Sequence, residues 1–195
     1  MSEPTARLLF KRSIPDYVRF VEDSLNFKGV EFKFYDSGHI VGSKSVLINS
    51  DVRIFYTGDL STDTRIVLNP LKPVETDILI VEATYGAVPY IFPERYRLYR
   101  KILRKVSYFK DVGRLLVLGA RSPGTAQELA ALLSNSRKSF DIYMDPKVYR
   151  DSLVHFDYDY VSARFERAAG FAPVKGDVFI TCLLYTSDAA DDGES

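Results

Sequence analysis

Two apolar runs that each lead into a glycine-flanked turn place the strongest constraint on how this chain folds. The first run leads into Ser37-Gly-His39-Ile-Val-Gly-Ser43, and the second leads into Tyr56-Thr-Gly-Asp59. Glycine lets the backbone turn tightly and leaves room beside the neighbouring side chain. An imidazole and a carboxylate at adjacent strand ends are ligands that Zn²⁺ accepts at about 2.0–2.2 Å. By spacing alone, however, a hydrogen-bonded turn histidine and a turn aspartate explain the pair better.

Composition excludes several classes of protein. The chain has 195 residues, of which 46% are hydrophobic and 27% charged, and this balance is typical of a globular protein. Its length allows one large domain or parts of two. No apolar run approaches the roughly 18 residues of a membrane-spanning helix, so we expect no membrane association. One cysteine cannot form an internal disulfide, which favours a reducing, cytoplasmic location.

The last residues differ from the rest of the chain. Residues 182–195 (CLLYTSDAADDGES) cut off the apolar run DVFIT and then turn small and acidic. We interpret them as a non-native tail, because they resemble the translated read-through of a sequencing adaptor; a natural acidic tail is the alternative. The tail holds four of the 26 acidic residues and no basic one, so the 26 basic residues of the remaining chain face 22 acidic ones.

Periodicity predicts an α/β chain whose character changes after Gly86. Before Gly86 we expect helices over residues 3–10 and 15–25, a strand over 30–37, a hairpin that turns at 49–51, and a strand within 77–86 that is buried on both faces. After Gly86, helices over 93–108, 125–133 and 146–155 alternate with strands over 113–120 and 141–145. This alternation predicts a parallel sheet. Thr125 and Glu128 fit a capping box at the start of the second of these helices.

The helix predicted over residues 93–108 is rich in basic residues. Eight lysines and arginines fall between Arg95 and Arg114, with tyrosines among them. We favour a solvated helix face as the explanation. An RNA contact is the alternative, because cations that bind phosphates release counterions. Stacking on bases would need exposed tyrosines, which spacing does not establish.

The segments SGHIVGS, FYTGD and ILIVEATYG, in this order and at these separations, resemble the metallo-β-lactamase-fold nucleases that carry a β-CASP domain. GRLLVLGARSPGTAQELAALL (residues 113–133) and DIYMDP (141–146) also have counterparts there. The resemblance covers residues 1–181. It implies a partial metallo-β-lactamase αββα sandwich over residues 1–88 and the start of an inserted β-CASP α/β domain over 89–181. The activity implied is that of a zinc-dependent ribonuclease in RNA 3′-end processing or decay.

The resemblance also implies roles for three residues. His39 matches a ligand of one zinc, and Asp59 matches the aspartate that bridges two zincs and takes part in catalysis. Glu82 matches a catalytic-site carboxylate that stands behind the ligands and accepts a hydrogen bond from a ligating imidazole, which fixes its tautomer. The implied partners are RNA and either a second copy of the chain or an RNA-processing complex.

Two departures from the family pattern are clear. The His-x-His-x-Asp-His signature is missing, because no histidine precedes His39. We therefore expect a fragment truncated at both ends that is inactive alone, since even one catalytic zinc takes three protein ligands. His155 matches none of the later β-CASP histidines, and we interpret it as a structural or surface residue.

Three other functions remain open. A non-catalytic scaffold of an RNA-processing complex belongs to the same family, and a small-molecule metallo-hydrolase shares the fold. A binding-only α/β module is the third, and it predicts that His39 and Asp59 lie far apart.

Overall fold

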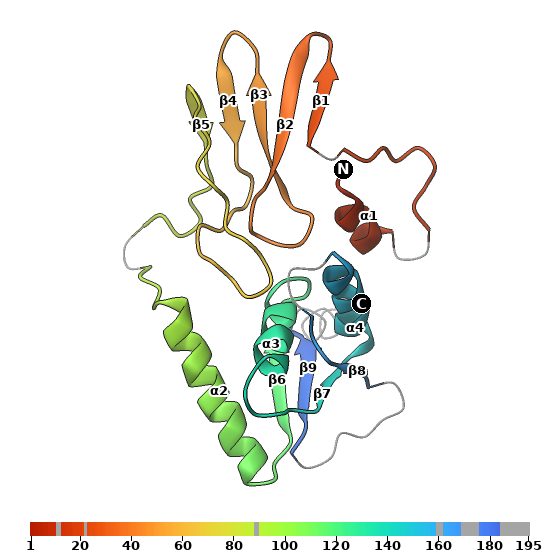
Figure 1. Cartoon of the computed structure of the whole chain (residues 1–195), viewed down its shortest axis with the longest axis vertical. Helices are drawn as coiled ribbons and strands as arrows, with labels where there is room; N and C mark the ends of the chain where they lie inside the picture. The colour runs from red at the N-terminus through yellow and green to blue at the C-terminus, as the bar shows by residue number, and fades with distance from the viewer. Residues whose placement is uncertain (11–12, 22, 88–89, 159–161, 169–175, 184–195) are drawn as a thin grey trace, which may run out of the picture. The chain divides into compact units, whose positions relative to one another are not determined.

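The computed structural model describes residues 1–10, 13–21, 23–87, 90–158, 162–168 and 176–183. The chain divides into two compact units, Met1–Phe92 and Pro93–Ser195, which we call unit 1 and unit 2 (Figure 1). Each unit has its own sheet, and helices accompany both, so the predicted α/β class is confirmed. No helix within the described ranges is long and apolar enough to cross a membrane.

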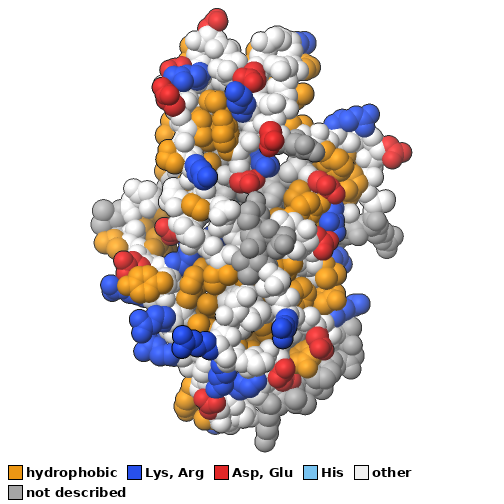
Figure 2. All heavy atoms as spheres, viewed as in Figure 1, with side chains coloured by type: hydrophobic (Ala, Val, Ile, Leu, Met, Phe, Trp, Pro, Cys, Tyr) orange, Lys and Arg blue, Asp and Glu red, His pale blue; other side chains and the backbone are white. Residues whose placement is uncertain are grey.

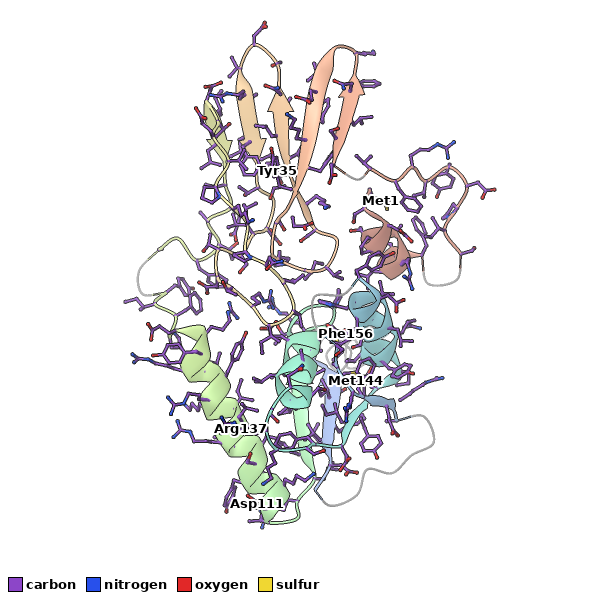
Figure 3. The ribbon with its side chains drawn as sticks, viewed as in Figure 1. Met1, Tyr35, Asp111, Arg137, Met144 and Phe156 are labelled. Atoms are coloured by element: carbon purple, nitrogen blue, oxygen red, sulfur yellow. The ribbon has the colours of Figure 1, made fainter. Side chains whose placement is uncertain are left out.

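The described residues of unit 1 form one short helix and a five-stranded sheet. Its elements are α1 (Glu3–Leu9), β1 (Ser24–Phe27), β2 (Val30–Asp36), β3 (Lys44–Asn49), β4 (Arg53–Tyr56) and β5 (Ile78–Ile80). The strands follow one another in sequence order; β5 pairs parallel with β4, and the other pairs are antiparallel. The hairpin predicted at residues 49–51 is confirmed, because Asn49 pairs with Arg53. Tyr35 packs edge to face against Phe55 with ring centroids 5.9 Å apart (Figure 3).

The helix predicted over residues 15–25 is wrong. Lys28 and Gly29 both have positive φ, +50° and +81°, which is the geometry of a tight hairpin turn between β1 and β2. That turn places Leu25 opposite Phe32 in the sheet. Val18, Val21 and Leu25 do fall at helical spacing, but the hairpin recruits the last of them into a strand.

The burial predicted for the strand within 77–86 is also wrong. Ile78, Leu79 and Ile80 are 47%, 56% and 49% exposed. In the described part of the chain, β5 is the edge strand of the sheet and pairs with β4 alone. A continuous apolar run predicts a strand that can be buried on both faces. The run does not determine whether other elements of the chain cover those faces.

Unit 2 has the parallel sheet that the alternation predicted. Its elements are α2 (Arg95–Asp111), β6 (Leu116–Ala120), α3 (Thr125–Ser134), β7 (Ile142–Met144), α4 (Pro146–Asp157), β8 (Glu166–Arg167) and β9 (Val178–Cys182). The strand order is β6-β9-β7-β8 with every pair parallel. The core lies between this sheet and its helices, and Leu133, Met144 and Ile180 are fully buried in it (Figure 3 labels Met144).

The start of α3 differs from the predicted capping box. The N-cap is Gly124, whose φ of +123° favours glycine, and the side chain of Gln127 accepts a hydrogen bond from its N–H at 2.7 Å. Glu128 instead accepts a hydrogen bond from the hydroxyl of Tyr99. The prediction was therefore one residue out of register, because it took Thr125 rather than the glycine as the cap.

Two further predictions concern unit 2. His155 is 2% exposed and lies beside Phe156 with ring centroids 5.4 Å apart, so its structural interpretation holds and the surface alternative does not. Cys182, the first residue of the tail that we interpreted as non-native, is the last residue of β9 and is fully buried. Residues 184–195 of that tail lie outside the described residues.

Candidate metal centre

His39 lies in a turn that its own sequence locks into one conformation. The hydroxyl oxygens of Ser37 and Ser43, at the two ends of SGHIVGS, are 2.7 Å apart, and the N–H of Ile40 donates to Ser43 Oγ at 3.1 Å. Gly38 has a φ of +72°, and a Cβ there would lie 2.8 Å from the backbone oxygen of Asn69. Only glycine fits this position without movement of the backbone.

The N-terminus of α1 supports the same turn. Ser2 Oγ and Thr5 Oγ1 both donate to the carbonyl oxygen of Gly42, at 2.6 and 3.1 Å. Gly42 has a φ of +81°, and a Cβ there would lie 2.8 Å from the side chain of Pro4. The first residues of the chain therefore help to fix the turn that carries His39, a contact that sequence reasoning did not identify.

Asp59 lies in the turn that follows β4. The N–H of Thr57 donates to the carbonyl of Ile80 in β5 at 3.0 Å, and Ser45 Oγ donates to the carbonyl of Thr57 at 2.7 Å. Beyond Asp59, the N–H of Ser61 donates to the carbonyl of Ser37 at 2.9 Å. Backbone hydrogen bonds therefore fix the chain on both sides of Asp59, and the bond from Ser61 to Ser37 joins it directly to the turn that holds His39.

These two turns bring the imidazole and the carboxylate together. His39 Nε2 and Asp59 Oδ2 are 3.6 Å apart, and the side chains are 45% and 71% exposed. With bonds of 2.0–2.2 Å and tetrahedral angles, two ligands of one zinc ion lie about 3.4 Å apart. The pair therefore fits a shared cation after a small side-chain adjustment. The same distance disfavours the binding-only module, which required the two side chains to be far apart.

Glu82 follows β5, and its carboxylate is hydrogen-bonded to the backbone close to the His39–Asp59 pair. Its Oε2 accepts the backbone N–H of Thr84 at 2.9 Å. The N–H and hydroxyl of Thr84, then the N–H of Leu60, hold the pKa of the Glu82 carboxyl below its usual value, and the nearby His39 acts in the same direction. Glu82 thus contacts the residue that follows Asp59. Two of its donors are the backbone N–H groups of Leu60 and Thr84, and backbone N–H groups carry no sequence signal.

The described residues fall short of a complete metal site. Among them, no group of three or more histidine, cysteine, aspartate or glutamate side chains is arranged to hold a metal ion. His39 and Asp59 offer one nitrogen and one carboxylate, a donor set that suits zinc. Two ligands are fewer than the three that a catalytic zinc takes, so a complete site would need ligands beyond this pair.

Comparison with known proteins extends this geometry. No family model matches the chain. An RNase J-like protein of Methanocaldococcus jannaschii is 32% identical over 149 residues, which are 74% of this chain and 35% of that protein. The transcription termination factor FttA of the same organism is 27% identical over 163 residues, 77% of this chain and 26% of FttA. Cleavage and polyadenylation specificity factor 73 of Drosophila melanogaster is 30% identical over 129 residues, 64% and 19% respectively.

The chain is α/β, and the turns that follow β2 and β4 bring a histidine and an aspartate together at one end of the sheet of unit 1. This chain belongs to the β-CASP metallo-β-lactamase family of nucleases. The chain spans about a third or less of the length of these relatives.

Proposed function

We propose that this chain is part of a zinc-dependent ribonuclease that hydrolyses RNA phosphodiester bonds. The observation that carries the proposal is the 3.6 Å approach of His39 Nε2 to Asp59 Oδ2 from two separate turns. The relatives support the reaction class, because their names include an RNase J-like protein and endoribonucleases. A location in the cytoplasm and assembly into an RNA-processing complex or a homodimer belong to the same proposal.

The domain assignment is part of this proposal. Residues 1–88 form the metallo-β-lactamase part, which carries the ligands, and residues 89–181 form the start of the β-CASP part. The division of the chain after Phe92 and the change from a mostly antiparallel to a parallel sheet support a boundary near residue 88.

Three residues of this chain would have separate roles. His39 and Asp59 would bind the cation, and the hydrogen-bonded turns that carry them would fix the orientation of both side chains. A bound zinc would lower the pKa of its water and stabilise the charge that develops on a phosphodiester. Glu82 is a positioning residue: it accepts hydrogen bonds from the backbone of Leu60 and Thr84, and so holds the turn that carries Asp59.

The proposal is tested on the native gene product purified from its source. End-labelled RNA is incubated with it before and after removal of metal by a chelator, and with variants His39→Ala and Asp59→Asn. We expect cleavage that zinc restores after chelation and that both variants reduce by about 10³-fold or more, since both remove charge stabilisation in the transition state. Asp51→Asn is the matched control, because Asp51 is an exposed aspartate of the same unit, in the turn after β3.

Cleavage that survives chelation or both variants would contradict the proposal. RNA binding without cleavage at any zinc concentration would favour the non-catalytic scaffold. Zinc-dependent hydrolysis of a small phosphodiester or ester, with RNA left intact, would favour the small-molecule hydrolase.

A further inference from the structure

Helix α2 has two opposite faces of different character. Ile102, Leu103 and Val106 pack against the core of unit 2. At 100° per residue, the opposite side of the helix carries exposed residues, and its middle part holds four cations and a tyrosine. We call them the basic stripe: Arg100, Lys101, Arg104, Lys105 and Tyr108. Figure 2 shows basic side chains gathered over this part of the molecule.

The cations of the basic stripe are not balanced by nearby acids. Among the described residues, no carboxylate lies within 4.0 Å of any of the four. In the part of the chain that the structure describes, ion pairs of this helix lie towards its ends: Arg97 pairs with Glu94 at 2.7 Å, Lys110 pairs with Asp141 at 3.6 Å, and Asp111 pairs with Lys138. Like charges four residues apart destabilise a helix, and the stripe holds two such pairs. Helix stability therefore does not explain the arrangement, whereas a polyanionic partner does.

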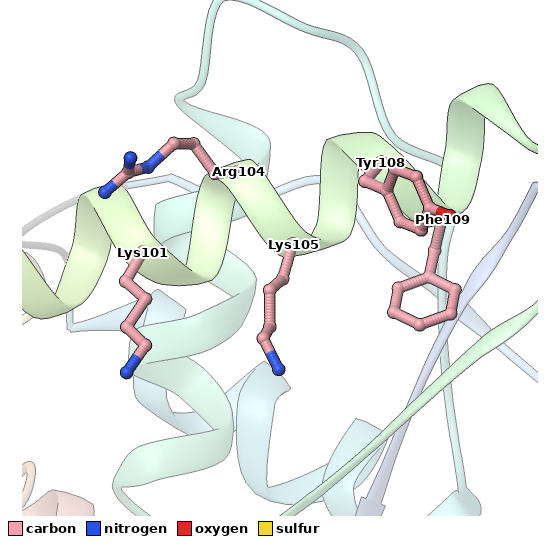
Figure 4. Close-up of a pocket in the computed structure, with 5 residues that line it drawn as sticks. All are labelled: Lys101, Arg104, Lys105, Tyr108 and Phe109. Carbon is pink, nitrogen blue, oxygen red and sulfur yellow. The ribbon is translucent and has the colours of Figure 1, made fainter.

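An aromatic surface adjoins these cations. Tyr108 is 62% exposed and packs edge to face against Phe109 with ring centroids 5.6 Å apart. Together with Lys101, Arg104 and Lys105, the two rings line an open hollow of about 570 Å³. In Figure 4, Lys101 and Lys105 extend to the same side of the helix as Phe109. Positive charge and an accessible ring thus occur in one place.

We propose that the basic stripe is a docking surface for single-stranded RNA. Its lysines and arginines contact phosphates, and Tyr108 stacks on a base, because aromatic rings beside a cationic track suit unpaired bases. The inference rests on the proposed function, since a ribonuclease must hold its strand. An acidic protein would satisfy the charges, but it would have no need of the exposed ring. The stripe extends over about 12 Å of helix, from Arg100 to Tyr108.

The test is a binding titration in chelator, so that hydrolysis cannot interfere. Fluorescence anisotropy follows a labelled short poly(U) strand bound by the full chain and by the triple variant Lys101→Gln/Arg104→Gln/Lys105→Gln. We expect the variant to bind at least about tenfold more weakly and the slope of log Kd against log salt to fall by about 2, since each phosphate contact on a single strand adds about 0.7.

The matched control is Arg150→Gln/Arg164→Gln/Arg167→Gln. These three arginines are exposed in the same unit, so the variant makes the same change in net charge. We expect its affinity to change by no more than about twofold, because they lie in α4 and around β8, at the sheet edge opposite the strand β6 on which α2 packs, and charges beyond the screening length contribute little. Tyr108→Ala should weaken binding roughly tenfold without altering the salt slope, and Tyr108→Phe should retain the affinity.

Equal weakening by the stripe variant and the control variant would overturn the proposal, because it would show attraction by net charge alone. Polyglutamate that binds the stripe as tightly as poly(U) would overturn it in favour of an acidic protein partner. The result is separable from the proposed function. RNA binding that depends on the stripe, without any cleavage, would contradict the proposed ribonuclease activity and leave the docking surface standing. Cleavage whose KM for RNA is unchanged in the stripe variant would contradict the docking surface and leave the ribonuclease activity standing.

Discussion

Unit 2 packs its own helices against its sheet around a buried core, whereas unit 1 leaves an apolar edge strand exposed. In unit 2, residues from α3, α4 and the parallel strands form one buried cluster. In unit 1, β5 is about half exposed, and hydrogen-bonded turns around Gly38 and Thr57 supply much of the order. Burial therefore determines the fold of unit 2, while turn geometry determines the site in unit 1. The predictions below test this contrast.

Two isoleucines in strands offer the largest contrast. Ile180 in β9 is fully buried, and Ile80 in β5 is 49% exposed. We expect Ile180→Ala to lower the free energy of unfolding of unit 2 by about 3–4 kcal/mol, because it leaves a cavity. Ile80→Ala should cost unit 1 about 1 kcal/mol or less, because little apolar surface returns to water. Urea titrations followed by NMR signals of each unit measure both values, and similar costs would remove the contrast.

Two glycines test whether turns hold unit 1. Gly38 and Gly29 both have positive φ, but a Cβ at Gly38 would meet backbone oxygen at 2.8 Å and a Cβ at Gly29 would meet open space. We expect Gly38→Ala to cost about 3 kcal/mol, from the left-handed backbone and the overlap together. Gly29→Ala should cost about 1 kcal/mol. Chemical denaturation of unit 1 gives both numbers; if Gly29→Ala costs as much, close contact at Gly38 is not what matters.

The start of α4 tests a local feature of unit 2. The Asp145 carboxylate accepts from the N–H groups of Lys147 and Val148 at 2.8 and 2.9 Å and from that of Cys182 at 2.9 Å. Burial raises the pKa of Asp145, but these N–H donors and the side chain of Thr181 together outweigh it and leave the pKa below the usual value. Asp145→Ala should cost unit 2 about 1 kcal/mol as a lost N-cap.

The same residue gives a pH dependence. Because the pKa of Asp145 is lower in the folded chain, its stabilisation is complete above the unfolded pKa, about 4. It is lost as the pH falls through the folded pKa. We expect unfolding titrations to show this loss in the native chain and not in Asp145→Ala. An identical acid response in the two proteins would contradict the assignment.

Glu82 gives the most localised effect. If it positions the Asp59 turn, Glu82→Gln should weaken zinc binding by about tenfold without changing the stability of unit 2, as expected for a group that orients ligands. Glu75→Gln is the control, because Glu75 is an exposed glutamate of the same unit whose ion pair is with Arg53, at 3.6 Å. Calorimetric zinc titration of the three proteins provides the comparison. Equal zinc affinities for the native chain, Glu82→Gln and Glu75→Gln would contradict a positioning role for Glu82.

Sequence patterns predicted unit 2 better than unit 1 for a physical reason. Asp145 before Pro146 is a local helix start, and alternating helices and strands dictate a parallel sheet. The helix expected over residues 15–25 failed in two ways: residues 15–21 are irregular, and the hairpin turn at Lys28 and Gly29 takes Ser24 and Leu25 into β1. Burial of β5 could not be predicted, since an apolar run says nothing about which surfaces cover it.

The candidate site shows the same division. Three ordered motifs and the family that they resemble selected His39, Asp59 and Glu82, and their roles stay a prediction. The groups that hold them in place were missed: the hydroxyls of Ser2 and Thr5 on the Gly42 carbonyl, and the N–H groups of Leu60 and Thr84 on Glu82. Backbone donors have no residue signature, because every residue except proline carries one.

The most direct test of the account is imidazole NMR during a zinc titration of the chain. The chain has two histidines, so a long-range ¹H–¹⁵N spectrum contains only His39 and the buried His155. We predict that zinc shifts the Nε2 signal of His39, that Asp59→Asn reduces this response, and that His155 stays unchanged. A His39 signal that ignores zinc, or that responds equally without the Asp59 carboxylate, would contradict the claim that the two turns serve one metal ion.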